Sequence, residues 1–258
     1  MPRSTTVSSF NQRFFETVGP HFVTLSCVQL TPEKKALVFS GFLVEAADAW
    51  FYVTAGHILR KIRAAINAGG EFDIWRLDDQ TAGHQAPAIP YDFDISEWLV
   101  VENEENGLDY AAIQLKSIYC MQLKAGGAVA INKAGWGDHV SEHDQWAIVG
   151  FPSETVVYDD KSIITGRVAV MPLEHAEEPS VAGSKAENQF YACLKDMGNI
   201  KDIDGMSGGP IFALFKVNGE WRYKVIGIQS GWYPQTRTIA ACPFATFGAE
   251  LERLAKQA

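Results

Sequence analysis

Apolar residues occur along most of the chain in short runs rich in Val, Ile, Phe, Tyr and Trp, and Gly, Pro, Asn or Asp bound most of the runs. Branched and aromatic side chains favour β-strands, and the bounding residue types favour turns. Many short strands at this spacing are typical of an all-β sandwich or barrel. The predicted strands cover residues 22–30, 36–44, 50–54, 71–77, 110–115, 146–151, 162–171, 189–194, 210–215 and 222–230, with a short one near Ile239. The pair Asn218-Gly219 between two of these runs predicts a tight hairpin.

Helical periodicity is confined to residues 8–18, 58–68 and 244–256. In the last segment apolar residues recur every three or four positions, as they do on one face of a helix: Phe244, Phe247, Leu251 and Leu254. Residues 121–137, with the pair Gly126-Gly127, form the best boundary between two halves of the chain. We therefore predict two domains, residues 1–125 and 126–258.

The composition is that of an ordinary globular protein, with 258 residues of which 47% are apolar and 21% charged. It excludes disordered, collagen-like and coiled-coil proteins. With 22 basic and 31 acidic side chains the net charge is -9, which argues against nucleic acid as a partner. No apolar run reaches the length of about 18 residues that a membrane-spanning helix needs, so no membrane association is expected.

The cysteines and the N-terminal residues bear on the cellular compartment. Residues 1–15 lack the continuous apolar core of a secretory signal. None of the four cysteines has the C-x-x-C spacing typical of zinc and redox sites. We expect free, mostly buried thiols, no metal, no organic cofactor and a cytoplasmic location. The cysteines are Cys27, Cys120, Cys193 and Cys242.

The clearest motif is Asp-Gly-Met-Ser-Gly-Gly-Pro at residues 204–210, which places Ser207 among glycines directly before an apolar strand. Glycine leaves room for a substrate to reach the hydroxyl, and it permits backbone angles that let successive N–H groups converge on an oxyanion. The motif therefore indicates a nucleophilic serine. The structural alternative is a glycine-rich turn before a strand.

The order of the histidines limits the chemistry that Ser207 can use. A Gly-x-Ser-x-Gly string also marks the α/β-hydrolase elbow, but that class needs its histidine after the serine. Every histidine here precedes Ser207, which leaves schemes in the order His, Asp, Ser. His57 is the best candidate for the base because it follows the apolar run 50–54 and two small residues, which places the ring at a strand end.

Asp109 is the best candidate for the carboxylate of such a triad. It stands directly before the apolar run 110–115, whereas Asp73, Asp78 and Asp79 lie in more polar surroundings. An acid that enters an apolar strand is costly unless it has a partner. A hydrogen bond from the imidazole would provide one, would fix the imidazole tautomer and would stabilise the imidazolium.

Together, three segments resemble the signatures of the trypsin-like serine peptidases of the chymotrypsin fold. They are Thr-Ala-Gly-His at 54–57, Gly-Leu-Asp-Tyr-Ala-Ala-Ile at 107–113 and Gly-Met-Ser-Gly-Gly-Pro at 205–210. The resemblance covers most of the chain from residue 22 onward. It implies an all-β fold of two packed six-stranded antiparallel barrels with a C-terminal helix, here joined by the short N-terminal helix predicted above. It also implies a serine endopeptidase that cleaves polypeptides through an acyl-enzyme.

By the same resemblance, His57 is the general base, Asp109 its orienting carboxylate and Ser207 the nucleophile. The N–H groups of Gly205 and Ser207 would form the oxyanion hole. Ile58 replaces the cysteine that follows the histidine in secreted animal members, which suits an intracellular, bacterial-type member.

The resemblance also suggests residues that bind substrate. The stretch that contains Ser230, Gly231 and Trp232 resembles the family strand that pairs with the substrate backbone. The residue six before the serine lines the specificity pocket in the family, and here it is Lys201, with Asp202 next to it. Lys201 would favour acidic or neutral side chains and Asp202 basic ones, so the sequence leaves the preference open.

Met206 departs from the family pattern in a way that concerns activation. Activatable zymogens carry an aspartate at this position, and it pairs with a newly freed N-terminus. Methionine cannot form that pair, so we expect activity without N-terminal cleavage. A regulatory protein partner is left open.

Three other interpretations compete with the peptidase. His-Val-Ser-Glu-His at residues 139–143 matches the zinc motif His-x-x-Glu-His, but that motif needs a helix and this segment predicts a surface loop. The chain could instead be a catalytically silent module that holds a peptide or a partner protein by strand addition. A purely structural β-domain would leave the ordered trio of His57, Asp109 and Ser207 unexplained.

Overall fold

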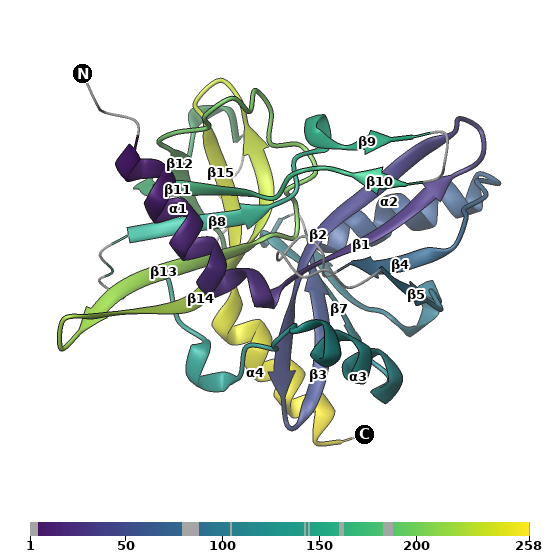
Figure 1. Ribbon diagram of the computed structural model, residues 1–258, viewed down its shortest axis with the longest axis horizontal. Helices are drawn as coiled ribbons and strands as arrows, with labels where there is room; N and C mark the ends of the chain where they lie inside the picture. Colours follow the sequence, from purple (N-terminus) through teal and green to yellow (C-terminus); the bar gives the residue numbers. More distant parts are fainter. Residues whose placement is uncertain are drawn as a thin grey trace.

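The computed structural model describes residues 5–78, 88–103, 105–141, 143, 145–159, 163–182 and 188–257. These residues form a mostly β fold in two halves, with a helix near each end of the chain (Figure 1). The first half is an antiparallel sheet and the second is a closed barrel. The predicted all-β class is confirmed.

The first half holds a seven-stranded sheet in the order β5-β4-β1-β2-β3-β7-β6. The resemblance implied a six-stranded barrel there, whereas the structure has a sheet with one strand more, and its two short edge strands, β5 and β6, were not among the predicted strands. β5 contains Pro90 and β6 ends in polar residues, so neither has the pattern of a typical strand. The strands are β1 (Phe22–Gln29), β2 (Lys35–Ala46), β3 (Ala49–Thr54), β4 (Trp75–Asp78), β5 (Ile89–Tyr91), β6 (Leu99–Asn103) and β7 (Leu108–Gln114).

The second half is a closed six-stranded barrel, as expected, in the order β11-β12-β15-β14-β13-β8. The predicted hairpin joins β13 to β14, with φ of 52° at Asn218 and 83° at Gly219, which are the left-handed angles that a tight hairpin turn needs. The predicted strand 162–171 is wrong as one element, because it divides into β10 and the start of β11. The strands of this half are β8 (Gln145–Gly150), β9 (Val157–Tyr158), β10 (Ile164–Thr165), β11 (Ala169–Ala176), β12 (Phe190–Leu194), β13 (Pro210–Val217), β14 (Glu220–Tyr233) and β15 (Thr238–Pro243).

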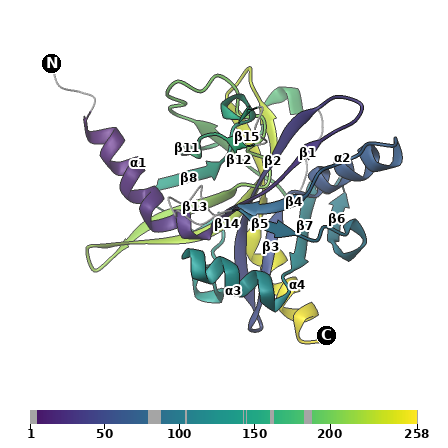
Figure 2. The same ribbon diagram turned by 45° about the vertical axis from the view of Figure 1, so that its right-hand side comes forward.

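Four α-helices occur in the described residues, and three of them match the predicted segments: α1 (Thr5–Val18), α2 (Gly56–Asn67) and α4 (Phe244–Ala255). α1 runs beside strands β8 and β13 in both ribbon views (Figure 1 and Figure 2). The fourth, α3 (Ser117–Gly126), was not predicted, and it overlaps the start of the stretch 121–137 that was predicted to be the boundary between the halves. Its end is marked by Gly127, whose φ of 94° closes the helix in a left-handed cap.

A shared apolar core fixes the two halves against each other. It includes Phe42 from β2, Phe212 from β13 and Phe244 from α4, all fully buried. The ring of Phe244 meets that of Phe42 at 5.5 Å, and Tyr110 stacks on Phe247 at 4.5 Å. Because α4 contacts both β2 and β14, side chains from the two halves are held in a fixed relation at the cleft between them.

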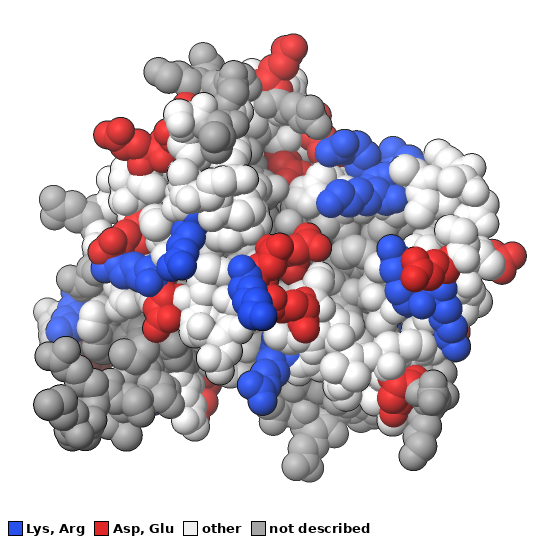
Figure 3. All heavy atoms as spheres, turned by 90° about the horizontal axis from the view of Figure 1, so that it is seen from above, with Lys and Arg blue, Asp and Glu red and all other residues white. Residues whose placement is uncertain are grey.

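The described surface carries charges of both signs. On the face seen in Figure 3, basic and acidic side chains are interspersed around a central hollow, and no single sign of charge covers it. None of the described helices combines the length and the apolarity needed to cross a membrane. His139 and His143 lie outside any helix, which confirms the loop predicted there, and Glu142 lies outside the described residues.

Candidate active site

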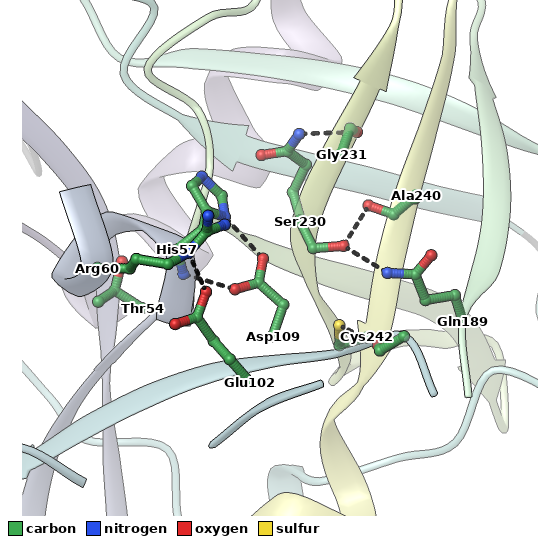
Figure 4. Close-up of polar contacts among 12 residues, drawn as sticks. Thr54, His57, Arg60, Glu102, Asp109, Gln189, Ser230, Gly231, Ala240 and Cys242 are labelled. Carbon is green, nitrogen blue, oxygen red and sulfur yellow. Dashed lines mark hydrogen bonds and ion pairs between the residues drawn. The ribbon is translucent and has the colours of Figure 1, made fainter. Parts of the chain in front are cut away.

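His57 and Asp109 are joined by two short hydrogen bonds. The backbone N–H of His57 donates to Asp109 Oδ1 over 2.7 Å, and the ring Nδ1 lies 2.7 Å from Asp109 Oδ2 (Figure 4). Only 14% of the His57 side chain and 13% of the Asp109 side chain is exposed. A carboxylate oxygen can only accept, so the proton of the neutral ring lies on Nδ1 and Nε2 is left as an acceptor.

The local sequence explains why these two residues meet. β3 ends at Thr54, and His57 lies in the first turn of α2, where its N–H group has no acceptor within the helix. Asp109 enters β7 opposite this turn and provides the acceptor. Gly56 permits the close approach, because a Cβ there would lie 2.6 Å from Glu102 Cγ and 3.1 Å from Asp109 Oδ1. A larger residue at this position would therefore require the neighbouring atoms to shift.

Ser207 lies in the turn that leads into β13. The flanking glycines Gly205 and Gly208 have φ of 89° and 84°, a left-handed conformation that disfavours other residues. A Cβ at Gly208 would also overlap Thr54 Oγ1 and the Ser40 carbonyl oxygen. Both glycines are thus fixed by backbone conformation and by packing, as the motif predicted.

Some backbone N–H groups of the serine turn donate hydrogen bonds within the protein and others do not. Those of Met206, Gly208 and Gly209 donate to backbone carbonyls of Ile203, Gln229 and Met206 over 3.0, 2.8 and 2.9 Å. In the described part of the chain the N–H groups of Gly205 and Ser207 donate no hydrogen bond. These two N–H groups are therefore available to an external acceptor, as an oxyanion hole requires.

Residues from both halves line one cleft of about 640 Å³. His57 and Asp109 line it from the first half and Ser207 from the second. No hydrogen bond joins the Ser207 hydroxyl to His57 among the described residues. Catalytic hydrogen bonds are often long before substrate binds, so this leaves the pair available for chemistry.

All three residues predicted on the substrate-pairing strand, Ser230, Gly231 and Trp232, line the cleft. Ser230 sits at an irregularity in the pairing of β14 with β15. Its hydroxyl donates to the Ala240 carbonyl over 3.3 Å and accepts from Gln189 Nε2 over 3.2 Å (Figure 4). Gln189, the first residue of a predicted strand, was not predicted as a site residue, because no local motif marks it.

The two candidates for the specificity pocket are placed differently. Asp202 lines the cleft together with Asp204, whereas Lys201 is exposed and is not among the lining residues. The backbone N–H groups of Lys201 and Asp202 donate to the two carboxylate oxygens of Glu154 over 2.9 and 3.3 Å. These bonds fix the loop with Asp202 at the cleft.

Three further charged residues that were not predicted as site residues, Arg60, Lys61 and Glu102, also line the cleft. Arg60 Nε donates to Glu102 Oε1 over 2.9 Å, close to His57 (Figure 4). Arg60 lies in α2, one turn after His57, and Glu102 lies near the end of β6. The pairing of Arg60 with Glu102 depends on the short strand β6, which was not among the predicted strands.

The described residues hold no group of three or more His, Cys, Asp or Glu side chains arranged to bind a metal ion. The cysteine closest to the site is Cys242, whose Sγ lies 3.2 Å from the Gly107 carbonyl oxygen (Figure 4). Burial, followed by the negative charge of Asp109, raises the pKa of this thiol to about 12. Cys242 is therefore a neutral, unreactive thiol near neutral pH.

Comparison with known proteins gives a likeness of structure only. No family model and no curated sequence matches the chain. Among solved structures, one described as GrC has a TM-score of 0.53 at 14% identity and covers 92% of this chain and 94% of its own. The thermostable serine protease AL20 from an extremophilic microorganism has a TM-score of 0.47 at 17% identity, and the match covers 91% of this chain and 95% of AL20. The protease Anisep from Arthrobacter nicotinovorans has a TM-score of 0.46 at 15% identity, and the match covers 87% of this chain and 90% of Anisep. At such identities the likeness concerns the fold alone, and of these three matches the one to GrC exceeds a TM-score of 0.5.

Proposed function

We propose that the protein is a serine endopeptidase that hydrolyses polypeptides through an acyl-enzyme. The observation that carries the proposal is the doubly hydrogen-bonded His57–Asp109 pair in a cleft that Ser207 also lines. The same constellation, with the residues in the same chain order, serves acyl transfer in known serine peptidases. Neither a metal nor an organic cofactor enters the mechanism.

In the proposed reaction, substrate binding brings the Ser207 hydroxyl to Nε2 of His57. Nε2 takes the hydroxyl proton as Oγ attacks the scissile carbonyl, and the N–H groups of Gly205 and Ser207 stabilise the negative oxygen that forms. His57 then gives the proton to the leaving amine, and an acyl-enzyme remains. Water, deprotonated by His57, releases the carboxylic acid and restores the serine.

Met206 supports the proposal that the serine turn needs no freed N-terminus. Its side chain is fully buried in the core of the barrel, together with Ile148 and Ile211. The turn is thus anchored by apolar packing at the position where zymogens depend on an ion pair. Its conformation therefore does not depend on a charge supplied elsewhere.

A fluorophosphonate probe tests the function directly. Oγ of a nucleophilic serine attacks phosphorus and displaces fluoride, so we expect one adduct per chain, and peptide mass spectrometry should locate it on Ser207. Heat-denatured protein should not react, because labelling depends on the folded arrangement with His57. An inert native protein under varied conditions would refute the peptidase and favour the silent peptide-binding module.

A thiol reagent provides the matched control for the nucleophile. Alkylation needs a thiolate, and a thiol whose pKa is about 12, such as Cys242, is almost entirely protonated at pH 8. Iodoacetamide should therefore leave Cys242 unmodified and the hydrolytic activity of the native protein intact. Loss of activity in step with alkylation of Cys242 would point to a different mechanism.

We further propose that the cleft prefers basic side chains in the substrate. Asp202 and Asp204 line it near Ser207, and among the described residues neither carboxylate forms a salt bridge. Exposed ion pairs contribute up to about 1 kcal/mol, so Asp202→Asn should raise KM for Lys- or Arg-containing peptides by about 5-fold.

The control for this specificity is Lys201→Gln, which changes a neighbouring charge that does not line the cleft. It should alter KM for the same peptides by less than about 2-fold, consistent with a solvent-exposed charge. Neutral peptides should respond little to either substitution. An Asp202→Asn variant that cleaves basic and neutral peptides with unchanged relative efficiency would contradict the assignment.

A further inference from the structure

A buried serine of the first half connects the two segments that carry the proposed catalytic residues. Ser40 lies in β2 and is fully buried, at 0% exposure. Its hydroxyl donates to the Gly205 carbonyl oxygen over 2.8 Å and accepts from the Phe151 backbone N–H over 2.9 Å. Both partners belong to the second half, so a single side-chain oxygen satisfies two backbone groups across the boundary between the halves.

The backbone of the same residue continues the connection toward His57. The Thr54 hydroxyl donates to the Ser40 carbonyl oxygen over 2.8 Å, and Thr54, also fully buried, stands three residues before His57. Gly208, on the other side of Ser207, packs against Thr54 and Ser40 so closely that a Cβ would overlap both. Ser40 is thus in contact with both flanks of the nucleophile and with the end of β3.

Two carbonyls in succession hold the peptides around Gly205. The Asp204 carbonyl accepts from the Ser153 N–H over 2.7 Å, and the next carbonyl, of Gly205, accepts from Ser40. Because a peptide group is planar, fixing a carbonyl also fixes the N–H of the same peptide. The bond from Ser153 therefore sets the direction of the Gly205 N–H, and the bond from Ser40 prevents the following peptide from rotating.

We propose that Ser40 is a positioning residue that holds the Gly205–Met206 peptide, which lies between the two peptides that carry the proposed oxyanion-hole N–H groups of Gly205 and Ser207. The inference rests on the proposed peptidase function. It adds that a residue of the first half orients the oxyanion site, which lies in the second half. Ser40 touches neither substrate nor the reacting atoms. Its effect is confined to the stabilisation of developing negative charge, a step distinct from nucleophile activation by His57.

Removing the hydroxyl should lower kcat and leave substrate binding nearly unchanged. Ser40→Ala leaves the Gly205 carbonyl and the Phe151 N–H buried without partners, and such groups favour rearrangement. We expect kcat to fall by about 10- to 100-fold with KM changed less than about 2-fold. Loss of an oxyanion donor itself costs about 10²- to 10³-fold. Ser40→Cys keeps the size and a weak donor, so it should recover part of the loss.

Active-site titration separates positioning from misfolding. The burst amplitude counts molecules that can still form the acyl-enzyme, and kcat is expressed per titrated site. Ser26→Ala is the matched control, because Ser26 is a buried serine of the same sheet, in the neighbouring strand β1. It should leave kcat per site unchanged even where the melting temperature falls.

The outcomes distinguish this inference from the function on which it rests. A wild type that neither reacts with fluorophosphonate nor cleaves peptides refutes the peptidase, and the role of Ser40 with it. An active wild type with unchanged kcat per site in Ser40→Ala overturns the positioning role alone. Equal losses in Ser40→Ala and Ser40→Cys would also overturn it, because the donor would then be irrelevant. A loss of kcat per site that Ser40→Cys partly restores supports it.

Discussion

Ser207→Ala is expected to lower kcat/KM for peptide hydrolysis by about 10⁶-fold and to abolish fluorophosphonate labelling. The methyl group can neither attack a carbonyl nor form an acyl-enzyme. The neighbouring glycines and the N–H groups of the turn would remain, so peptide binding should persist with a similar Kd. Hydrolysis by purified variant and wild type, measured over the same long incubation, provides the comparison.

The control for Ser207→Ala is Ser141→Ala, which removes an exposed hydroxyl that bonds to Asp138 in a loop outside the cleft. This variant should label and hydrolyse as the wild type does. Residual hydrolysis in Ser207→Ala above about one part in 10⁴ would mean that another residue is the nucleophile, or that the preparation contains a second peptidase.

Asp109→Asn is expected to lower kcat by about 10⁴-fold while leaving the fold intact. In the wild type both carboxylate oxygens accept, one from the His57 backbone N–H and the other from the ring. An amide has only one oxygen, and the backbone N–H can only donate, so that oxygen should take the position of Oδ1. The amide NH₂ then faces Nδ1 and forces it to accept, which moves the ring proton to Nε2. A ring protonated at Nε2 cannot take the proton of Ser207.

NMR of the His57 ring nitrogens would identify the tautomer, and kinetics would give the rate. Glu102→Gln is the matched control, since Glu102 also lines the cleft but bonds to Arg60 and not to the ring. It should change kcat by no more than a few-fold. An Asp109→Asn variant that retains the Nδ1–H tautomer, or more than a tenth of the wild-type kcat, would contradict the proposed role of Asp109.

The features predicted correctly are those that a short stretch of sequence determines. The runs that became β1, β2, β3 and β7 have branched or aromatic residues bounded by turn formers, and burial of each run reinforces the local preference. The hairpin at Asn218-Gly219 follows from two residues that adopt left-handed angles. Such elements need no knowledge of what lies beside them.

The elements that were missed depend on their neighbours. β5 has only three residues and contains Pro90, and β6 has only three apolar residues before Glu102, so pairing with adjacent strands determines their conformation more than their own residues do. In α3 the buried positions are Tyr119 and Leu123, too few to produce a clear helical period, although Gly127 marks the helix end. In each case tertiary contacts outweigh a weak local signal.

The candidate site likewise combines residues that a local motif marks with residues that only tertiary contacts bring into place. His57, Asp109 and Ser207 could be identified because each lies in a distinctive local motif and their order excludes other schemes. Ser40 could not, because its role arises from a contact with Gly205, 165 positions away, that only the register of the strands creates. The placement of Asp202, but not Lys201, among the residues that line the cleft likewise depends on the loop geometry set by Glu154.

The apolar core shared by the two halves has a consequence for how the protein loses its structure. Phe42, Phe212 and Phe244 belong to three different elements, and separating the halves would expose all of them to water at once. Partial melting of one half alone is thus unfavourable, and heat or denaturant should disrupt both in a single cooperative transition. A damaged molecule of this kind would rarely persist with one half folded, so molecules that survive in solution should carry an assembled cleft.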